Sequence, residues 1–112
     1  MNTDSLFDLG GRVAIVTGGG DGIGRACCRI LAAAGASVVV GDRSADKARQ
    51  TVSLIEAEGG KATAVECDVL RDDRLDALVK TAVDSYGTVN ILVNNAGFGG
   101  GADRPAGNGR FD

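Results

Sequence analysis

Apolar residues along the chain follow two different spacings. Short apolar runs occur at positions 13–16, 38–40 and 91–93, and a fourth stretch at 62–67 is apolar apart from a threonine and a glutamate. Runs of this length are typical of β-strands, and the unbroken valines at 38–40 are typical of a strand buried on both faces. Between these runs, apolar residues recur every three or four positions, as they do on one face of a helix. The pattern therefore predicts four strands separated by three helices.

Each predicted helix has its own apolar stripe, within positions 23–34, 45–55 and 75–86. A glycine follows each stripe, at positions 35, 59 and 87, and glycine readily adopts the left-handed conformation that ends a helix. We expect the stripes to face the core, with Cys27 and the strand residue Cys67 as small core residues. The stripes consist of Ile23, Ala26, Cys27, Ile30, Leu31 and Ala34; of Ala45, Ala48, Val52 and Ile55; and of Leu75, Leu78, Val79, Ala82, Val83 and Tyr86.

Strands that alternate with helices predict a parallel sheet covered by helices on its faces. The fold class expected is α/β: a Rossmann-like doubly wound sheet, here incomplete (βαβαβαβ), with strand order 3-2-1-4 in a three-layer sandwich. We expect one domain, with an N-terminal segment at 1–11 and the core at 12–97. The stretch 98–112 is rich in glycine and lacks periodicity, which predicts a loop or tail.

Composition narrows the classes of function. The chain has 112 residues, which suits one small domain. A net charge of −3 without a basic block argues against nucleic acid and anionic membranes as partners. The sequence shows neither a transmembrane-length apolar run nor a signal-peptide pattern, so we expect a cytoplasmic protein. It has three cysteines and no histidine, which leaves no histidine base or histidine metal ligand and makes a cysteine-only zinc site improbable.

The first strand is followed by five glycines within the seven residues 18–24. Between a strand and a helix, glycines let the backbone approach a pyrophosphate closely, while the helix N-terminus offers unpaired N–H groups. The alternative is a merely flexible loop, but such a loop has no reason to lie between a buried strand and a well-formed helix. No register of these glycines fits G-x-G-x-x-G, and no Lys-Ser or Lys-Thr follows them as in a P-loop.

Three motifs occur in order, each where a predicted strand ends. They are Thr-Gly-x-x-x-Gly-x-Gly at 17–24, Asp68-Val69, and Asn-Asn-Ala-Gly at 94–97. Together they resemble the short-chain dehydrogenase/reductase family, over essentially the whole chain to about position 101. Within the family, the stretch 37–101 is most similar to the bacterial hydroxysteroid dehydrogenases of the 7α type.

The resemblance implies that the glycine loop binds the pyrophosphate of a nicotinamide dinucleotide. The loop would be shaped by Gly18, Gly22 and Gly24, which follow the motif's Thr17. A backbone contact to the cofactor would come from Ile23.

The resemblance also implies that Asp42, which ends the second strand 18 residues beyond Gly24, accepts hydrogen bonds from the adenine ribose. The alternative is a solvated turn aspartate. Arg43 would either lie over the adenine or reach into water. A carboxylate at Asp42 repels a 2′-phosphate, and Asp21 adds negative charge in the loop, so the expected cofactor is NAD rather than NADP.

The resemblance gives the remaining motif residues roles near the two ends of the cofactor. Asp68 and Val69 correspond to the pair that contacts the adenine, although Asp68 could instead cap the third helix. Asn95 would contact the cofactor and hold strand four to its neighbours. Ala96 continues this motif, and Gly97 would let the chain pass close to the nicotinamide-side ribose.

Catalysis in this family depends on a serine and a Tyr-x-x-x-Lys pair, and the chain contains no such set. Its single tyrosine, Tyr86, lies on the third apolar stripe, and Asn90 stands four residues later in place of lysine. We therefore expect no catalytic residue here. The chain is expected to be the cofactor-binding part of an NAD(P)-dependent alcohol/ketone oxidoreductase.

Two readings of the whole chain follow. In the first, the intact protein acts on a small alcohol or ketone, with a hydroxysteroid, a sugar alcohol and a β-ketoacyl thioester all open, and forms a homo-oligomer (dimer or tetramer). In the second, the 112 residues form a stand-alone dinucleotide-binding module or an inactive remnant.

Overall fold

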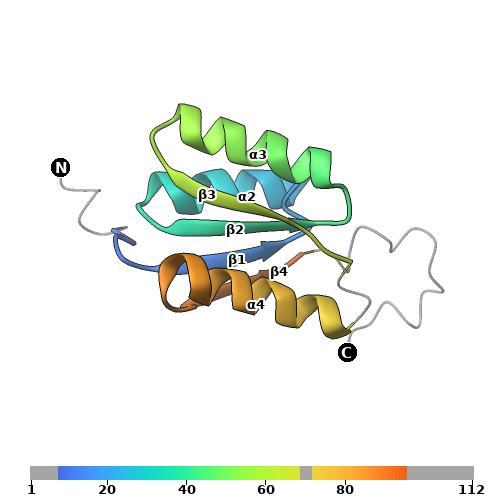
Figure 1. Cartoon of the computed structure of the whole chain (residues 1–112). Helices are drawn as coiled ribbons and strands as arrows, with labels where there is room; N and C mark the ends of the chain where they lie inside the picture. The colour runs from blue at the N-terminus through green and yellow to red at the C-terminus, as the bar shows by residue number, and fades with distance from the viewer. Residues whose placement is uncertain (1–7, 69–71, 96–112) are drawn as a thin grey trace, which may run out of the picture.

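A computed structural model of the chain describes residues 8–68 and 72–95. All seven predicted elements are present, in the predicted order (Figure 1). Ser44 begins the second helix, because its hydroxyl accepts a hydrogen bond of 3.2 Å from the N–H of Lys47. The elements are β1 (Val13–Thr17), α2 (Gly22–Ala33), β2 (Ser37–Asp42), α3 (Ala45–Ala57), β3 (Lys61–Glu66), α4 (Asp72–Tyr86) and β4 (Ile91–Asn94).

The four strands form one parallel sheet in the order β3-β2-β1-β4, which confirms the predicted strand order. In the middle of the sheet, Ile15 of β1 lies between Val39 of β2 and Leu92 of β4. Helices α2 and α3 cover one face and α4 covers the other, which gives three layers (Figure 1). Because the four strands are parallel, they all end at the same edge of the sheet.

The core has two parts, one on each face of the sheet. Alternate residues of β1 and β2 point to opposite faces, so each strand contributes to both parts. Cys67, as expected, is buried, on the α4 side. The part under α2 and α3 contains Val16, Cys28, Ala32, Ala36, Val38, Val40, Ala48 and Ile55. The part under α4 contains Val13, Ile15, Val39, Cys67, Leu78 and Ala82.

The predicted stripe of α2 is only partly correct, because Cys27 and Leu31 pack against the core but the fully buried face is a different one. Ile23 and Ile30 are 75% and 69% exposed. The residues that α2 buries are Gly24, Cys28 and Ala32, spaced four apart. These side chains are small because the helix packs closely against the sheet, whereas Ile23 and Ile30 lie on its outer flank. Cys27, predicted to be a small core residue, is only partly buried and packs at the edge of the core.

The stripe of α4 is half correct. Leu78 and Ala82 are fully buried against the sheet. Leu75, Val79 and Val83 are 38%, 44% and 45% exposed. On the neighbouring β4, Leu92 is 56% exposed. Within the described ranges β4 pairs with β1 alone, so its other edge carries backbone groups without a strand partner.

Of the N-terminal segment predicted at 1–11, only residues 8–11 are described. The glycine-rich stretch predicted at 98–112 lies outside the described residues. None of the helices in 8–68 and 72–95 has the length and apolar character needed to cross a membrane.

Candidate functional site

The residues predicted to bind a cofactor gather where the strands end. Thr17 ends β1, Asp42 ends β2 and Asn95 follows β4 directly. The loop of residues 18–21 leaves the same edge and leads into α2. In open α/β sheets this carboxyl edge is where ligands bind.

Two positions where the glycine loop turns into α2 require glycine, for different reasons. Gly22 adopts φ +55°, a conformation that other residues rarely take. A Cβ atom on Gly24 would run into the carbonyl oxygen of Gly18 and lie 2.8 Å from the amide nitrogen of Asn95. The loop and the first turn of α2 therefore touch backbone to backbone, which only glycine permits.

The N-terminus of α2 is open to an anion. Asp21 occupies the N-cap position in extended conformation but makes no capping hydrogen bond. Its carboxylate instead accepts a hydrogen bond of 2.9 Å from Lys47, which raises the pKa of that lysine. The first turn contains no acidic side chain. The first N–H groups of a helix have no partner within it and attract negative charge.

Asp42 is held in place by two backbone groups. Its Oδ2 accepts a hydrogen bond of 2.9 Å from the N–H of Gly20, and its Oδ1 accepts one of 2.9 Å from the N–H of Ser44. A carboxylate has about four acceptor positions, so it can still accept hydrogen bonds from a ribose. Arg43 is exposed and makes no hydrogen bond or ion pair with any residue in the described ranges.

Asn95 connects β4 to the glycine loop. Its backbone N–H donates to the hydroxyl of Thr17 at 2.9 Å, and its side-chain amide donates to the carbonyl of Gly18 at 3.2 Å. The hydroxyl of Thr17, fully buried, also lies 3.1 Å from the side-chain oxygen of Asn94. These bonds fix the start of the loop relative to the last strand.

The remaining predicted residues are less well placed by the structure. Asp68 is partly buried just after β3, four residues before α4 begins. Val69, Ala96 and Gly97 lie outside the described residues.

A second group of residues around the loop was not predicted from the sequence. Arg25 and Thr51 both contact the loop's backbone through hydrogen bonds to Gly19 and Gly20. One signal was available. Thr51 is a polar residue that lies three positions after Ala48 and four before Ile55, on the buried face of α3.

Tyr86 and Asn90 have structural roles. The hydroxyl of Tyr86 lies 2.8 Å from that of Thr63 on β3. The side-chain oxygen of Asn90 accepts a hydrogen bond of 2.8 Å from Val13, the first residue of β1. Asn90 is therefore at the amino edge of the sheet, opposite the glycine loop, and the two residues do not form a catalytic pair.

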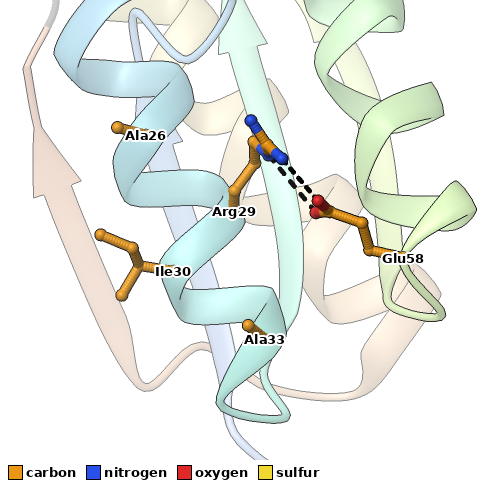
Figure 2. Close-up of a pocket in the computed structure, with 5 residues that line it drawn as sticks. All are labelled: Ala26, Arg29, Ile30, Ala33 and Glu58. Atoms are coloured by element: carbon orange, nitrogen blue, oxygen red, sulfur yellow. Dashed lines mark hydrogen bonds and ion pairs between the residues drawn. The ribbon is translucent and has the colours of Figure 1, made fainter.

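A shallow hollow of about 470 Å³ lies on the outer flank of α2 (Figure 2). Arg29 points toward Glu58 at the end of α3 and pairs with it, which lowers the pKa of that carboxyl, while Ile30 points away from α3. The residues that line the hollow come from α2 and from the end of α3, and none of them belongs to the glycine loop or to a strand end. It does not resemble a dinucleotide site. Its lining residues are Ala26, Arg29, Ile30, Ala33 and Glu58.

Comparison with known proteins decides the family. The family model described as short chain dehydrogenase matches residues 12–108. The chain belongs to the short-chain dehydrogenase family. Among curated members of this family, the 7alpha-hydroxysteroid dehydrogenase of Escherichia coli K12 is 48% identical over 100 residues, which cover 89% of this chain and 39% of the relative. The short-chain dehydrogenase/reductase homolog YusS of Bacillus subtilis is 44% identical over 86 residues, covering 76% of this chain and 79% of YusS.

Solved structures of the family agree with the fold. A 7 alpha-hydroxysteroid dehydrogenase complexed with NADH and 7-oxo glycochenodeoxycholic acid superimposes with a TM-score of 0.79 at 45% identity. The match covers 85% of this chain and 37% of that structure. The hydroxysteroid dehydrogenase of Escherichia coli gives a TM-score of 0.79 at 46% identity. The chain spans about two fifths of the length of these hydroxysteroid dehydrogenases.

Proposed function

We propose that this chain is the cofactor-binding part of an NAD-dependent oxidoreductase that interconverts an alcohol and a ketone. One observation carries the proposal. This chain belongs to the short-chain dehydrogenase family, and its Asp42 and Asn95 are both hydrogen-bonded to the glycine loop at the carboxyl edge of the sheet. The loop, the ribose-binding carboxylate and the last strand thus form one connected site.

The residues present fit a nicotinamide dinucleotide. The glycine backbone and the open N-terminus of α2 would hold the pyrophosphate, since Gly24 lets the first turn of α2 lie directly against the backbone of the loop. Asp42 would accept hydrogen bonds from the adenine ribose. Asp68 and Val69 would contact the adenine, and Asn95, Ala96 and Gly97 would line the nicotinamide side. The cofactor, when bound, would supply the acceptor for the substrate's hydride.

The proposed preference is for NAD over NADP. Two N–H groups hold the Asp42 carboxylate in place, so it cannot easily turn away from a 2′-phosphate. Asp21 adds a second negative charge, although its pairing with Lys47 reduces its effect. Arg43 is exposed, and its guanidinium could pair with a 2′-phosphate.

For the complete protein we propose a hydroxysteroid as substrate, on the basis of the relatives' names. A serine and a Tyr-x-x-x-Lys pair outside these 112 residues would supply the proton transfer. We further propose a cytoplasmic protein that acts as a homo-oligomer, with neither nucleic acid nor membrane as a partner.

The test is an assay of the complete protein with NAD and a panel containing a 7α-hydroxysteroid, a sugar alcohol and a β-hydroxyacyl thioester. We expect NADH formation with one of these substrates. The isolated 112-residue chain, tested in parallel, should form none. Steady NADH formation by the pure isolated chain would refute the assignment of catalysis to other residues. A complete protein that neither turns over nor binds NADH would refute the function itself.

A second proposal is a stand-alone dinucleotide-binding module or an inactive remnant. The observation in its favour is the match to YusS, of which this chain covers 79%. The intact mass of the natural protein discriminates between the two proposals. A mass well above that of 112 residues, with a downstream Ser and Tyr-x-x-x-Lys, supports the oxidoreductase.

A further inference from the structure

We propose that Arg25 and Thr51 are positioning residues that hold the glycine loop in the shape needed to bind a pyrophosphate. This inference rests on the proposed dinucleotide-binding function. Neither residue belongs to the family motif on which that function was recognised. Arg25 follows the motif on α2, and Thr51 comes from α3, the next helix along the chain.

The buried hydroxyl of Thr51 acts both as a hydrogen-bond donor and as an acceptor. Its side chain is fully buried. The hydroxyl donates to the carbonyl of Gly19 at 2.8 Å and accepts from Nε of Arg25 at 2.9 Å. A buried hydroxyl has one proton to donate, and here that proton goes to the loop.

Arg25 extends this contact to the next peptide group. Its Nη2 donates to the carbonyl of Gly20 and also to the side-chain oxygen of Gln50, at 3.2 Å. The planar guanidinium presents its donors in a fixed fork, so one side chain can hold the loop, Thr51 and Gln50 in a defined geometry. Two successive carbonyls of the loop are therefore hydrogen-bonded to side chains, one from α3 and one from α2.

These contacts fix the orientation of the loop's peptide groups. The peptide between Gly19 and Gly20 is held at both ends, because its carbonyl accepts from Thr51 and its N–H donates to Asp42. The N–H of Gly19 also donates to the carbonyl of Gly41 at 2.9 Å. In a planar trans peptide the N–H points opposite to the carbonyl, so tying the Gly20 carbonyl toward Arg25 turns the next N–H, that of Asp21, to the other side of the loop.

The loop's conformation is thus set by one network of the chain's own hydrogen bonds. A preorganised loop binds more tightly because less conformational entropy is lost on binding. Loss of either positioning residue should weaken ligands that use the pyrophosphate and spare ligands that lack it. A role limited to packing α2 against α3 would affect both kinds of ligand equally.

The experiment compares ADP-ribose, which contains the pyrophosphate, with adenosine, which lacks it, as ligands of the complete protein. Thr51→Val removes the hydroxyl at nearly constant volume, and Thr51→Ser restores it. Arg25→Met removes the fork. Arg29→Met is the matched control, because Arg29 lies on the same helix, has the same charge and points toward Glu58 (Figure 2).

We expect Thr51→Val and Arg25→Met each to raise the dissociation constant of ADP-ribose about tenfold, with that of adenosine changed less than about twofold. Thr51→Ser and Arg29→Met should stay within about threefold of the unmodified protein for both ligands. Should Thr51→Val fail to fold, the pair Arg25→Met and Arg29→Met decides by the same comparison.

Equal losses for ADP-ribose and adenosine, or no loss in either variant, would overturn the positioning role and leave the dinucleotide-binding function in place. Failure of the unmodified protein to bind ADP-ribose would overturn the proposed function, and the inference with it.

Discussion

In the proposed function, the preference for NAD over NADP depends most directly on the side chain of Asp42. We predict that Asp42→Ala in the complete protein weakens NAD binding by about 10- to 100-fold, because hydrogen bonds to a charged group contribute about 1.5–3 kcal/mol. NADP binding should weaken much less or improve, since the repulsion of the 2′-phosphate is removed. The measurement is the dissociation constant of each cofactor for both proteins.

Asp46→Ala is the matched control, because it removes an equal charge from the exposed face of α3, where Asp46 pairs with Arg49. Its cofactor affinities should not change. Tighter binding of NADP than of NAD by the unmodified protein would contradict the assignment and make Arg43 the deciding residue.

The neighbours Cys27 and Cys28 should differ sharply in reactivity. Cys28 is fully buried, and burial, followed by the neighbouring Cys27, raises its pKa to about 12. A raised thiol pKa means that the reactive thiolate is scarce at pH 8. We predict that a thiol reagent at pH 8 modifies partly buried Cys27 in the folded protein and reaches Cys28 only on unfolding. Peptide mass mapping after timed labelling checks this, and equal rates at both positions would contradict it.

At the scale of elements, the strands and the order of the sheet were predictable from the sequence. The run at 38–40 is apolar throughout because β2 is covered on both faces, and such a run predicts a buried strand. The buried face of α2 was not predictable in the same way. The helix carries apolar residues around most of its surface, and the face in contact with the sheet is marked by small residues, Gly24 and Ala32, instead of by the large Ile30.

The candidate site also contains some residues that the sequence predicts and others that it does not. Thr17 and Asn95 were predictable because each occurs in a motif where a strand ends, and Asp42 because it ends β2, 18 residues beyond Gly24. Arg25 and Thr51 contact the loop from two different helices. Their meeting depends on how α2 packs beside α3, which the spacing of residues along the chain does not reveal.

On α4, burial predicts which leucine carries stability. Leu78 is fully buried, whereas Leu75 on the same helix is 38% exposed. We predict that Leu78→Ala lowers the free energy of unfolding by about 2–5 kcal/mol, through lost burial and the cavity left behind. Leu75→Ala should lower it by less than about 1 kcal/mol. Denaturant titration of the complete protein measures both, and equal losses would show that α4 packs against the sheet by another face.

At the scale of the whole molecule, apolar side chains remain exposed on helices α2 and α4 and on the edge strand β4. Ile23 and Ile30 are exposed on α2, and Leu92 is exposed on β4. An unpaired strand edge flanked by apolar side chains favours association with other chains. We therefore predict that the isolated 112-residue chain self-associates, and that Ile30→Lys with Leu92→Lys reduces the association.

Sedimentation velocity at several protein concentrations measures this association. The control is Arg49→Lys, which retains an exposed positive charge on α3 and should leave the distribution unchanged. A monomeric isolated chain with a sharp thermal transition would contradict the prediction.

The central claim is that the glycine loop at the carboxyl edge of the sheet binds a nicotinamide dinucleotide. The most direct test is a fluorescence titration of the complete protein with NADH, alongside Gly24→Ala and the control Ala33→Val, which adds apolar bulk at an exposed position of the same helix. The added methyl at Gly24 would collide with the carbonyl of Gly18. We predict saturable binding that Gly24→Ala weakens by about tenfold or more and Ala33→Val leaves unchanged, with all three proteins folded by circular dichroism. Undiminished NADH binding by folded Gly24→Ala, or no binding by the unmodified protein, would contradict the claim.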